Sequence, residues 1–171
     1  VKLVQQEMVT SALTKTDRSP VTVADFAAQA LVAHLLAETF PDDPLVGEED
    51  AGDLRVEEHR SALDRVTSFV GRMVPGASPE AVCDWIDLGG AEPGPRFWTL
   101  DPVDGTKGFL RGEQYAVALA LIVEGKVQLG VLGCPNVADG RRPEIGGPGS
   151  VVCAVVGQGT WTAPLGDGAV Q

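Results

Sequence analysis

The sequence predicts an α+β fold in which two long helices pack on a largely antiparallel sheet. Two stretches of helical length, 23–39 and 57–74, carry apolar residues at helical spacing. Two apolar runs, 115–123 and 126–133, flank the short joint Glu124-Gly125 and therefore indicate a β-hairpin. Because hairpin strands are antiparallel neighbours, we expect most of the sheet to be antiparallel. The 171 residues suffice for one core, so we expect 1–171 to form a single domain.

The first half of the chain is predicted to be mostly helical. Apolar residues within 1–14 recur at the spacing of an amphipathic helix, and the polar stretch 15–20 indicates a loop. Thr22 is the expected N-cap of the helix over 23–39. The buried stripe of that helix is expected to consist of Ala24, Ala27, Ala28, Leu31, Leu35 and Leu36. A shorter helix is expected to begin after Ser78, with Pro79 in its first turn, and to end near Asp87.

Strands account for the remaining apolar segments. We expect them at 45–47, 96–100, 115–123, 126–133, 151–156 and 160–162. The stretch 91–95 is rich in Gly and Pro, which predicts a loop. Residues 137–149 combine Gly, Pro and charged residues, so an exposed and mobile loop is expected there.

The charge of the chain excludes one class of partner. The formal net charge is -11 and the pI is about 4.5, whereas a nucleic-acid-binding surface needs a basic footprint. We therefore expect no nucleic-acid partner. A small phosphorylated substrate remains compatible with this charge, because bound cations can reverse the local field.

Cysteine usage and hydropathy bear on the compartment. Cys83, Cys134 and Cys153 are odd in number and widely spaced, which argues against a disulfide framework and favours a reducing compartment. No apolar run reaches the roughly 18 residues needed to span a bilayer, and no signal peptide opens the sequence. These observations lead us to expect a cytoplasmic protein without a membrane partner. They do not indicate an oligomeric state.

An acidic corner is the most informative stretch of the chain. It reads LDPVDGTKGF over 100–109 and follows a segment expected to be a buried strand. Pro102 restricts its own φ and biases Asp101 toward extended backbone, and Gly105 then permits a tight turn. Asp101 and Asp104 therefore sit on a stiff corner, where carboxylates suit a hard cation such as Mg²⁺. Asp, Pro and Gly are also ordinary turn formers, so composition alone leaves both interpretations open.

Other acids lie at the edges of apolar elements. Asp25 is expected in the first turn of the helix over 23–39, where a carboxylate favours the positive end of the helix dipole. Glu48, Glu49 and Asp50 follow the short strand over 45–47. Four acids in such places could converge on two or three Mg²⁺ ions, but sequence spacing alone does not show that they do.

Three motifs make the chain similar to a known family. They are KTDRSPVTVAD over 15–25, VGEED over 46–50 and DPVDGTKGF over 101–109, followed by LRGEQYAVAL over 110–119. Together they resemble the lithium-sensitive, Mg²⁺-dependent phosphatases related to inositol monophosphatase, over nearly the whole chain. Within that superfamily, KGF over 107–109 with Arg111-Gly112 and Gln114-Tyr115 looks like the 3'(2'),5'-bisphosphate nucleotidase branch.

The resemblance implies a role for each site residue. One metal would be bound by Glu48, Asp101 and the main-chain carbonyl of Val103, and a second by Asp101 and Asp104. Glu49 would lie beside a further metal position. The remaining roles concern water and phosphate: Asp25 and the Thr106 hydroxyl would orient and deprotonate the attacking water, while the amides of Gly105 and Thr106 would face the phosphate.

The resemblance also implies a reaction and a missing part. The expected activity is removal of the 3'-phosphate from adenosine 3',5'-bisphosphate, with the sulfated form of that nucleotide as a second candidate substrate, by water attack without a covalent intermediate. In the family a second domain follows, with a Trp-Asp motif that completes the second metal site, and no such motif follows Trp161 here. The chain is therefore expected to be the N-terminal, metal-binding domain. Two alternatives stay open: an inositol polyphosphate 1-phosphatase, or a metal-binding fragment that does not catalyse.

Overall fold

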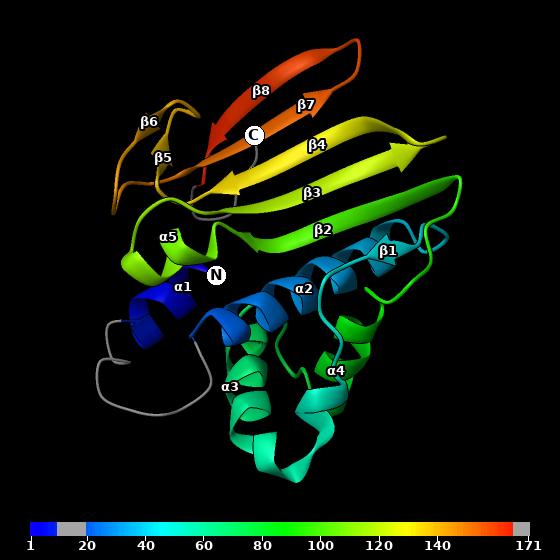
Figure 1. Ribbon diagram of the computed structural model, residues 1–171, viewed down its shortest axis with the longest axis vertical. Helices are drawn as coiled ribbons and strands as arrows, with labels where there is room; N and C mark the ends of the chain where they lie inside the picture. The colour runs from blue at the N-terminus through cyan, green and yellow to red at the C-terminus, as the bar shows by residue number, and fades with distance from the viewer. Residues whose placement is uncertain (10–19, 166–171) are drawn as a thin grey trace.

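A six-stranded sheet organises the computed structural model, which describes residues 1–9 and 20–165. The strands follow one another in the order β1-β2-β3-β4-β7-β8 (Figure 1). Their bounds are β1 Leu45–Val46, β2 Arg96–Asp104, β3 Ala116–Val123, β4 Lys126–Cys134, β7 Ser150–Val155 and β8 Gly159–Pro164. Every neighbouring pair is antiparallel except β1 with β2, which is parallel. The expected α+β fold with a largely antiparallel sheet is confirmed.

The predicted hairpin is the join between β3 and β4. Val123 pairs with Lys126, and the two residues between them both adopt positive φ, 50° at Glu124 and 71° at Gly125. Positive φ at both central residues is typical of the tight turn whose twist matches two antiparallel strands. A local sequence signal was therefore sufficient to locate these two strands.

The long helices form layers on one side of the sheet. Helix α2, Pro20–Thr39, packs on β2, while α3, Arg60–Gly71, and α4, Pro79–Asp87, pack against α2 from the other side (Figure 1). Short 3₁₀ turns, Gly52–Arg55 and Glu57–His59, lead into α3. Ser78 caps α4 as predicted, since its side-chain oxygen accepts from the Ala81 N–H at 3.2 Å.

Because α2 lies between a sheet and two helices, it is buried on almost all sides. The predicted single stripe is therefore wrong in part: Leu35 is 58% exposed, whereas Phe26, Gln29 and Ala33 are buried. Two clusters of buried side chains flank this helix. One joins α2 to α3, α4 and α5, and the other joins α2 to β1 and β2 through Leu36, Leu45 and Trp98.

Several predicted boundaries shift. Helix α2 begins at Pro20, so Thr22 lies inside it rather than capping it. Asp25 consequently falls in the second turn, beyond the turn where the helix dipole acts most strongly. In place of one long N-terminal helix, α1, Lys2–Val4, is followed by the π-helical turn η1, Gln5–Val9. The expected features over 10–19 lie outside the described residues.

The segment over 137–149 also differs from the expected loop. It contains a small two-stranded ladder in which β5, Val137–Ala138, pairs with β6, Arg142–Pro143. All three cysteines are free thiols, in agreement with the absence of a disulfide framework. Among the described helices, none combines the length and the apolar character that crossing a bilayer requires.

Candidate active site

Parallel pairing of β1 with β2 brings two acidic segments to one edge of the sheet. Leu45 is opposite Trp98 and Val46 is opposite Thr99. Counting two residues onward along each strand leads to Glu48 on one side and Asp101 on the other. Because parallel strands end at the same edge, the Glu48–Glu49 segment and the acidic corner are neighbours.

The acidic corner is an extended strand end followed at once by a helix. Strand β2 continues through Asp104, with a register irregularity between Asp101 and Asp104. The Val103 N–H donates to Asp101 Oδ1 at 3.1 Å, which fixes one carboxylate oxygen against the corner. Gly105 adopts φ 93° at the start of α5, Thr106–Arg111, so the tight turn predicted there is confirmed.

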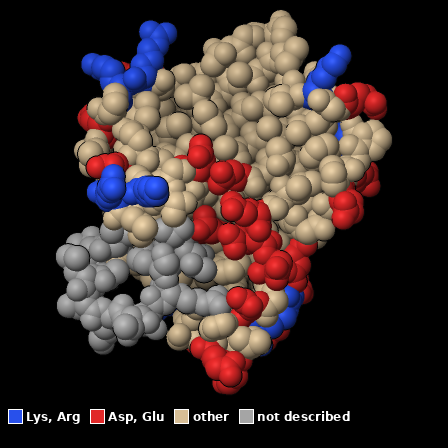
Figure 2. All heavy atoms as spheres, viewed as in Figure 1, with Lys and Arg blue, Asp and Glu red and all other residues tan. Residues whose placement is uncertain are grey.

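Asp25 is electrostatically linked to acids from both other segments. Its carboxyl is partly buried, and the charges of Glu49, Glu48 and Asp101 oppose its ionisation. Burial is the larger cause and these charges are the smaller one, and together they raise the pKa of Asp25 from 3.8 to about 7. Figure 2 shows Asp and Glu side chains gathered in a band that runs from the centre of the view towards its lower edge. Three segments far apart in the chain therefore contribute carboxylates to one neighbourhood.

The other acids influence one another in the same way. Burial, and then the charges of Glu48 and Asp50, raise the pKa of Glu49. Burial, and then the charge of Asp104, raise the pKa of Asp101, while the bond from the Val103 N–H acts in the opposite direction. Each of these carboxyl groups is destabilised in its charged form by burial and by a neighbouring acid. A bound cation would relieve that repulsion.

The chemistry of the donor atoms fits Mg²⁺, although the carboxylates do not converge on a single ion position. The described groups that act on Asp25 and Asp101 are carboxylates and one backbone N–H, and carboxylate oxygens are the donors that hard divalent cations prefer. No three His, Cys, Asp or Glu side chains in the described part of the chain are yet placed around a single ion position. The acids share one neighbourhood, and binding would require their side chains to rotate inward.

The remaining predicted residues lie at the same corner. Val103 is buried, whereas Asp104, Gly105 and Thr106 are exposed. Helix α5 packs against α2, the helix that carries Asp25 (Figure 1). No described hydrogen bond joins the Thr106 hydroxyl to Asp25, so their joint action on a water stays a prediction.

Sequence reasoning missed two residues that hold the acidic segment in place. Asp87, at the end of α4, accepts from the Ala51 N–H at 2.8 Å and pairs with Arg55 at 2.5 Å. The second residue is Gln29, a fully buried amide on α2 that contacts the backbone of Glu48 and Glu49. One sequence signal existed for Gln29: it lies four residues after Asp25, flanked by Ala28 and Ala30.

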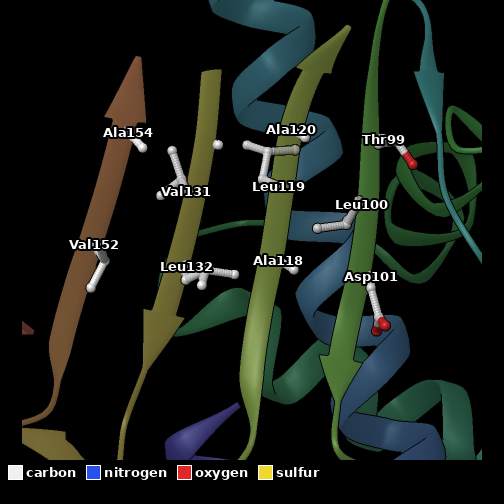
Figure 3. Close-up of a pocket in the computed structure, with 11 residues that line it drawn as sticks. Thr99, Leu100, Asp101, Ala118, Leu119, Ala120, Val131, Leu132, Val152 and Ala154 are labelled. Carbon is white, nitrogen blue, oxygen red and sulfur yellow. The ribbon is translucent and has the colours of Figure 1, made fainter. Parts of the chain in front are cut away.

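A hollow of about 380 Å³ opens on the sheet beside Asp101. Figure 3 shows Asp101 at the β2 side of this hollow, with small and aliphatic side chains on β3, β4 and β7. Thr99 and Asp101 are the lining residues with polar side chains. The acidic neighbourhood is thus bordered by an apolar sheet face.

Comparisons with known proteins agree with the motifs. The sequence profile of the Inositol monophosphatase family matches residues 2–170. The 3'(2'),5'-bisphosphate nucleotidase of Schizosaccharomyces pombe is 43% identical over 177 residues, covering 96% of this chain and 50% of its own length. The 3'(2'),5'-bisphosphate nucleotidase 1 of Arabidopsis thaliana is 49% identical over 135 residues, covering 72% of this chain and 38% of its own length. The chain spans about half the length of the curated relatives it matches.

The fold has a matching neighbour among solved structures. Inositol monophosphatase-II from Staphylococcus aureus MSSA476 superposes with a TM-score of 0.53 at 18% identity, covering 95% of this chain and 43% of that protein. At 18% sequence identity, this structural similarity supports the fold alone. The profile match over almost the entire chain speaks for descent, and this chain belongs to the inositol monophosphatase family.

Proposed function

We propose that this chain is the metal-binding part of a Mg²⁺-dependent phosphomonoesterase that removes the 3'-phosphate of adenosine 3',5'-bisphosphate to give AMP. The sulfated form of that nucleotide is a second proposed substrate. The observation that carries the proposal is the grouping of Asp25, Glu48, Glu49 and Asp101 from three separate segments. The identity of 43% and 49% with curated 3'(2'),5'-bisphosphate nucleotidases supports the choice of substrate.

The carboxylates of the corner would hold the ions. Glu48, Asp101 and the Val103 carbonyl are the proposed ligands of one Mg²⁺, Asp101 and Asp104 of a second, and Glu49 borders a third position. When bound, Mg²⁺ neutralises phosphate charge and makes water more acidic. The ligands come from two neighbouring strand ends, β1 and β2, so the sheet itself sets the distance between them.

Asp25 and Thr106 would act on the attacking water. Asp25 is the proposed acceptor of the water proton, because its carboxyl lies in the same neighbourhood as the proposed metal ligands Glu48 and Asp101. The Thr106 hydroxyl would orient the same water. As the water oxygen bonds to phosphorus, the bond from phosphorus to the 3'-oxygen breaks. The 3'-oxygen leaves with the electron pair and takes up a proton, which gives AMP and inorganic phosphate.

The start of α5 would hold the phosphate. Gly105 has no side chain and Thr106 is the first residue of the helix, so the proposed contacts are their backbone N–H groups. A Cβ on Gly105 would lie 3.3 Å from the Gln114 carbonyl oxygen, and its φ of 93° disfavours any side chain. The turn that presents these N–H groups at the start of α5 therefore depends on glycine at this position.

Release of inorganic phosphate by the purified chain tests the proposal. We expect release from adenosine 3',5'-bisphosphate that requires Mg²⁺ and is lost in Asp25→Asn. The Schizosaccharomyces pombe relative, assayed under the same conditions, serves as the reference for the rate. Preference for an inositol polyphosphate would support the alternative phosphatase, and Mg²⁺ binding without any release would support a non-catalytic fragment.

A further inference from the structure

Gln29 is a buried amide whose hydrogen-bonding capacity is completely used. It lies on α2 with no solvent exposure. Its Nε2 donates to the Glu49 carbonyl at 2.6 Å and to the Ile86 carbonyl at 2.8 Å. Its Oε1 accepts from the N–H of Glu48 at 3.1 Å and of Glu49 at 3.0 Å. Two donors and two acceptor sites are all that a glutamine side chain offers.

The orientation of this amide follows from its partners. Two N–H groups face one end and two carbonyl groups face the other, so exchanging oxygen and nitrogen would set donor against donor and acceptor against acceptor. Gln29 accepts a hydrogen bond from the Glu49 N–H and donates one to the Glu49 carbonyl, as a residue on a neighbouring β-strand would. The Glu48–Glu49 backbone is therefore tied to α2 in one defined register.

Two glycines from other segments make room for this side chain. A Cβ on Gly47 would lie 2.7 Å from Gln29 Cδ, and a Cβ on Gly89 would lie 2.9 Å from the same atom. These glycines are themselves joined, because the Gly47 N–H donates to the Gly89 carbonyl at 2.7 Å. The end of β1, the end of α4 and the middle of α2 thus meet around one amide. A packing-only role would not require such a match of donors, acceptors and space.

We infer that Gln29 is the residue that positions the Glu48–Glu49 carboxylates against Asp25. Asp25 lies one turn before Gln29 on the same face of α2, so the amide fixes the acids relative to the proposed water-activating carboxyl. Asp87 holds the other end of the segment through the Ala51 N–H. With the backbone held at both ends, the positions from which the Glu48 and Glu49 side chains extend are fixed. Gln29 is a positioning residue and would touch neither metal nor substrate.

This inference rests on the proposed function only for the identity of the ligand that the acids bind. Its test has two readouts. Gln29→Met keeps the length of the side chain and removes all four hydrogen bonds. We expect faster hydrogen exchange at the Glu48 and Glu49 amides of the metal-free protein. We also expect the dissociation constant for Mg²⁺, measured by calorimetry, to rise by about 10- to 100-fold, as is usual when a residue that orients metal ligands is lost.

Ser150→Ala is the matched control. Ser150 is also fully buried and also uses its hydroxyl twice, accepting from the Gly140 N–H at 2.9 Å and donating to the Val137 carbonyl at 2.7 Å. Its partners lie far along the chain from the acids. A general loss of stability would affect both variants, whereas a positioning role affects Mg²⁺ affinity and Glu48–Glu49 exchange in Gln29→Met alone.

The outcomes separate this inference from the proposed function. Unchanged exchange at Glu48 and Glu49 in Gln29→Met, or equal loss of Mg²⁺ affinity in Ser150→Ala, would overturn the role of Gln29. A parent chain that binds no Mg²⁺ would instead overturn the metal part of the proposed function, and amide exchange would then decide the role of Gln29. If Gln29→Met does not fold, Gln29→Asn, one methylene shorter and unable to span all four partners, replaces it with the same readouts.

Discussion

At Asp25, burial and neighbouring charge both oppose ionisation, and stability should therefore depend on pH. Its pKa is about 7 in the folded chain and near 3.8 when unfolded, so the folded state binds more protons between these values. The contribution of Asp25 is then fully present below pH 3.8 and is lost as pH rises through 7. The full shift would correspond to about 4 kcal/mol, but partial exposure and screening reduce our expectation to about 2 kcal/mol.

Asp25→Asn tests this dependence in the metal-free protein. We expect the variant to be more stable than the parent at pH 8, with the difference shrinking toward pH 4 as the parent carboxyl becomes protonated. Chemical denaturation at several pH values measures both free energies of unfolding. A difference that does not change with pH would show that the folded state does not oppose ionisation of the Asp25 carboxyl.

Asp104 is an exposed carboxylate whose charge acts on Asp101. Since that charge helps raise the pKa of Asp101, Asp104→Asn should lower it and leave the metal-free chain at least as stable. Because a proposed ligand is lost, we expect Mg²⁺ affinity to fall by about tenfold or more. Thermal melting and calorimetry measure the two effects. A variant that unfolds would assign Asp104 a structural role instead.

At the scale of the element, the position of helix α5 is constrained by the backbone of Gln114, which packs against Gly108 of that helix. A Cβ on Gly108 would lie far inside contact distance of the Gln114 carbonyl oxygen and 2.9 Å from its carbon. Alanine in a helix is normally favoured over glycine by about 1 kcal/mol. Here the clash is with backbone, which cannot turn aside, so we expect Gly108→Ala to destabilise the chain by about 2 kcal/mol or more.

Gly71→Ala is the control for this prediction. Gly71 is the last residue of α3, and nothing lies within 4 Å of the position its Cβ would take. We expect that substitution to be neutral or slightly stabilising in the same thermal melts. Equal behaviour of the two variants would mean that the approach of Gln114 to α5 does not constrain the acidic corner.

The elements that the sequence predicted well are those determined by local chemistry. The β3–β4 hairpin follows from Glu124-Gly125, and the cap of α4 follows from Ser78-Pro79. The parallel β1–β2 pair has no local signal, because β1 is two residues long and its paired residues lie 53 positions further along the chain. That pairing brings Glu48 beside the acidic corner. The grouping of the acids therefore had to be inferred from resemblance, and Gln29 was missed because Gly47 and Gly89 reach it only in the fold.

Across the whole molecule, the long helices pack on the β1–β2 end of the sheet, and the apolar hollow opens on β2, β3, β4 and β7. Figure 2 shows few charged side chains over the strands in this view. Large apolar side chains are exposed on or beside β4, β7 and β8, including Leu132 at 42%, Val156 at 63% and Trp161 at 50%. Strand β8 is also an edge strand, and no strand of the described residues pairs with its outer side, which can therefore accept another chain.

We expect the purified chain to self-associate through the sheet face that carries the hollow, because contiguous exposed apolar surface favours association. The net charge of -11 opposes this, so association should increase as salt is raised and the screening length falls to about 10 Å near 0.1 M. Sedimentation velocity over a range of concentrations measures it. Leu132→Lys places a charge in the hollow and should shift the chain toward monomer, whereas Met73→Lys, at a 65% exposed site just after α3, should not. A chain that stays monomeric at every salt concentration, or responds equally to both substitutions, would show that this face does not drive association.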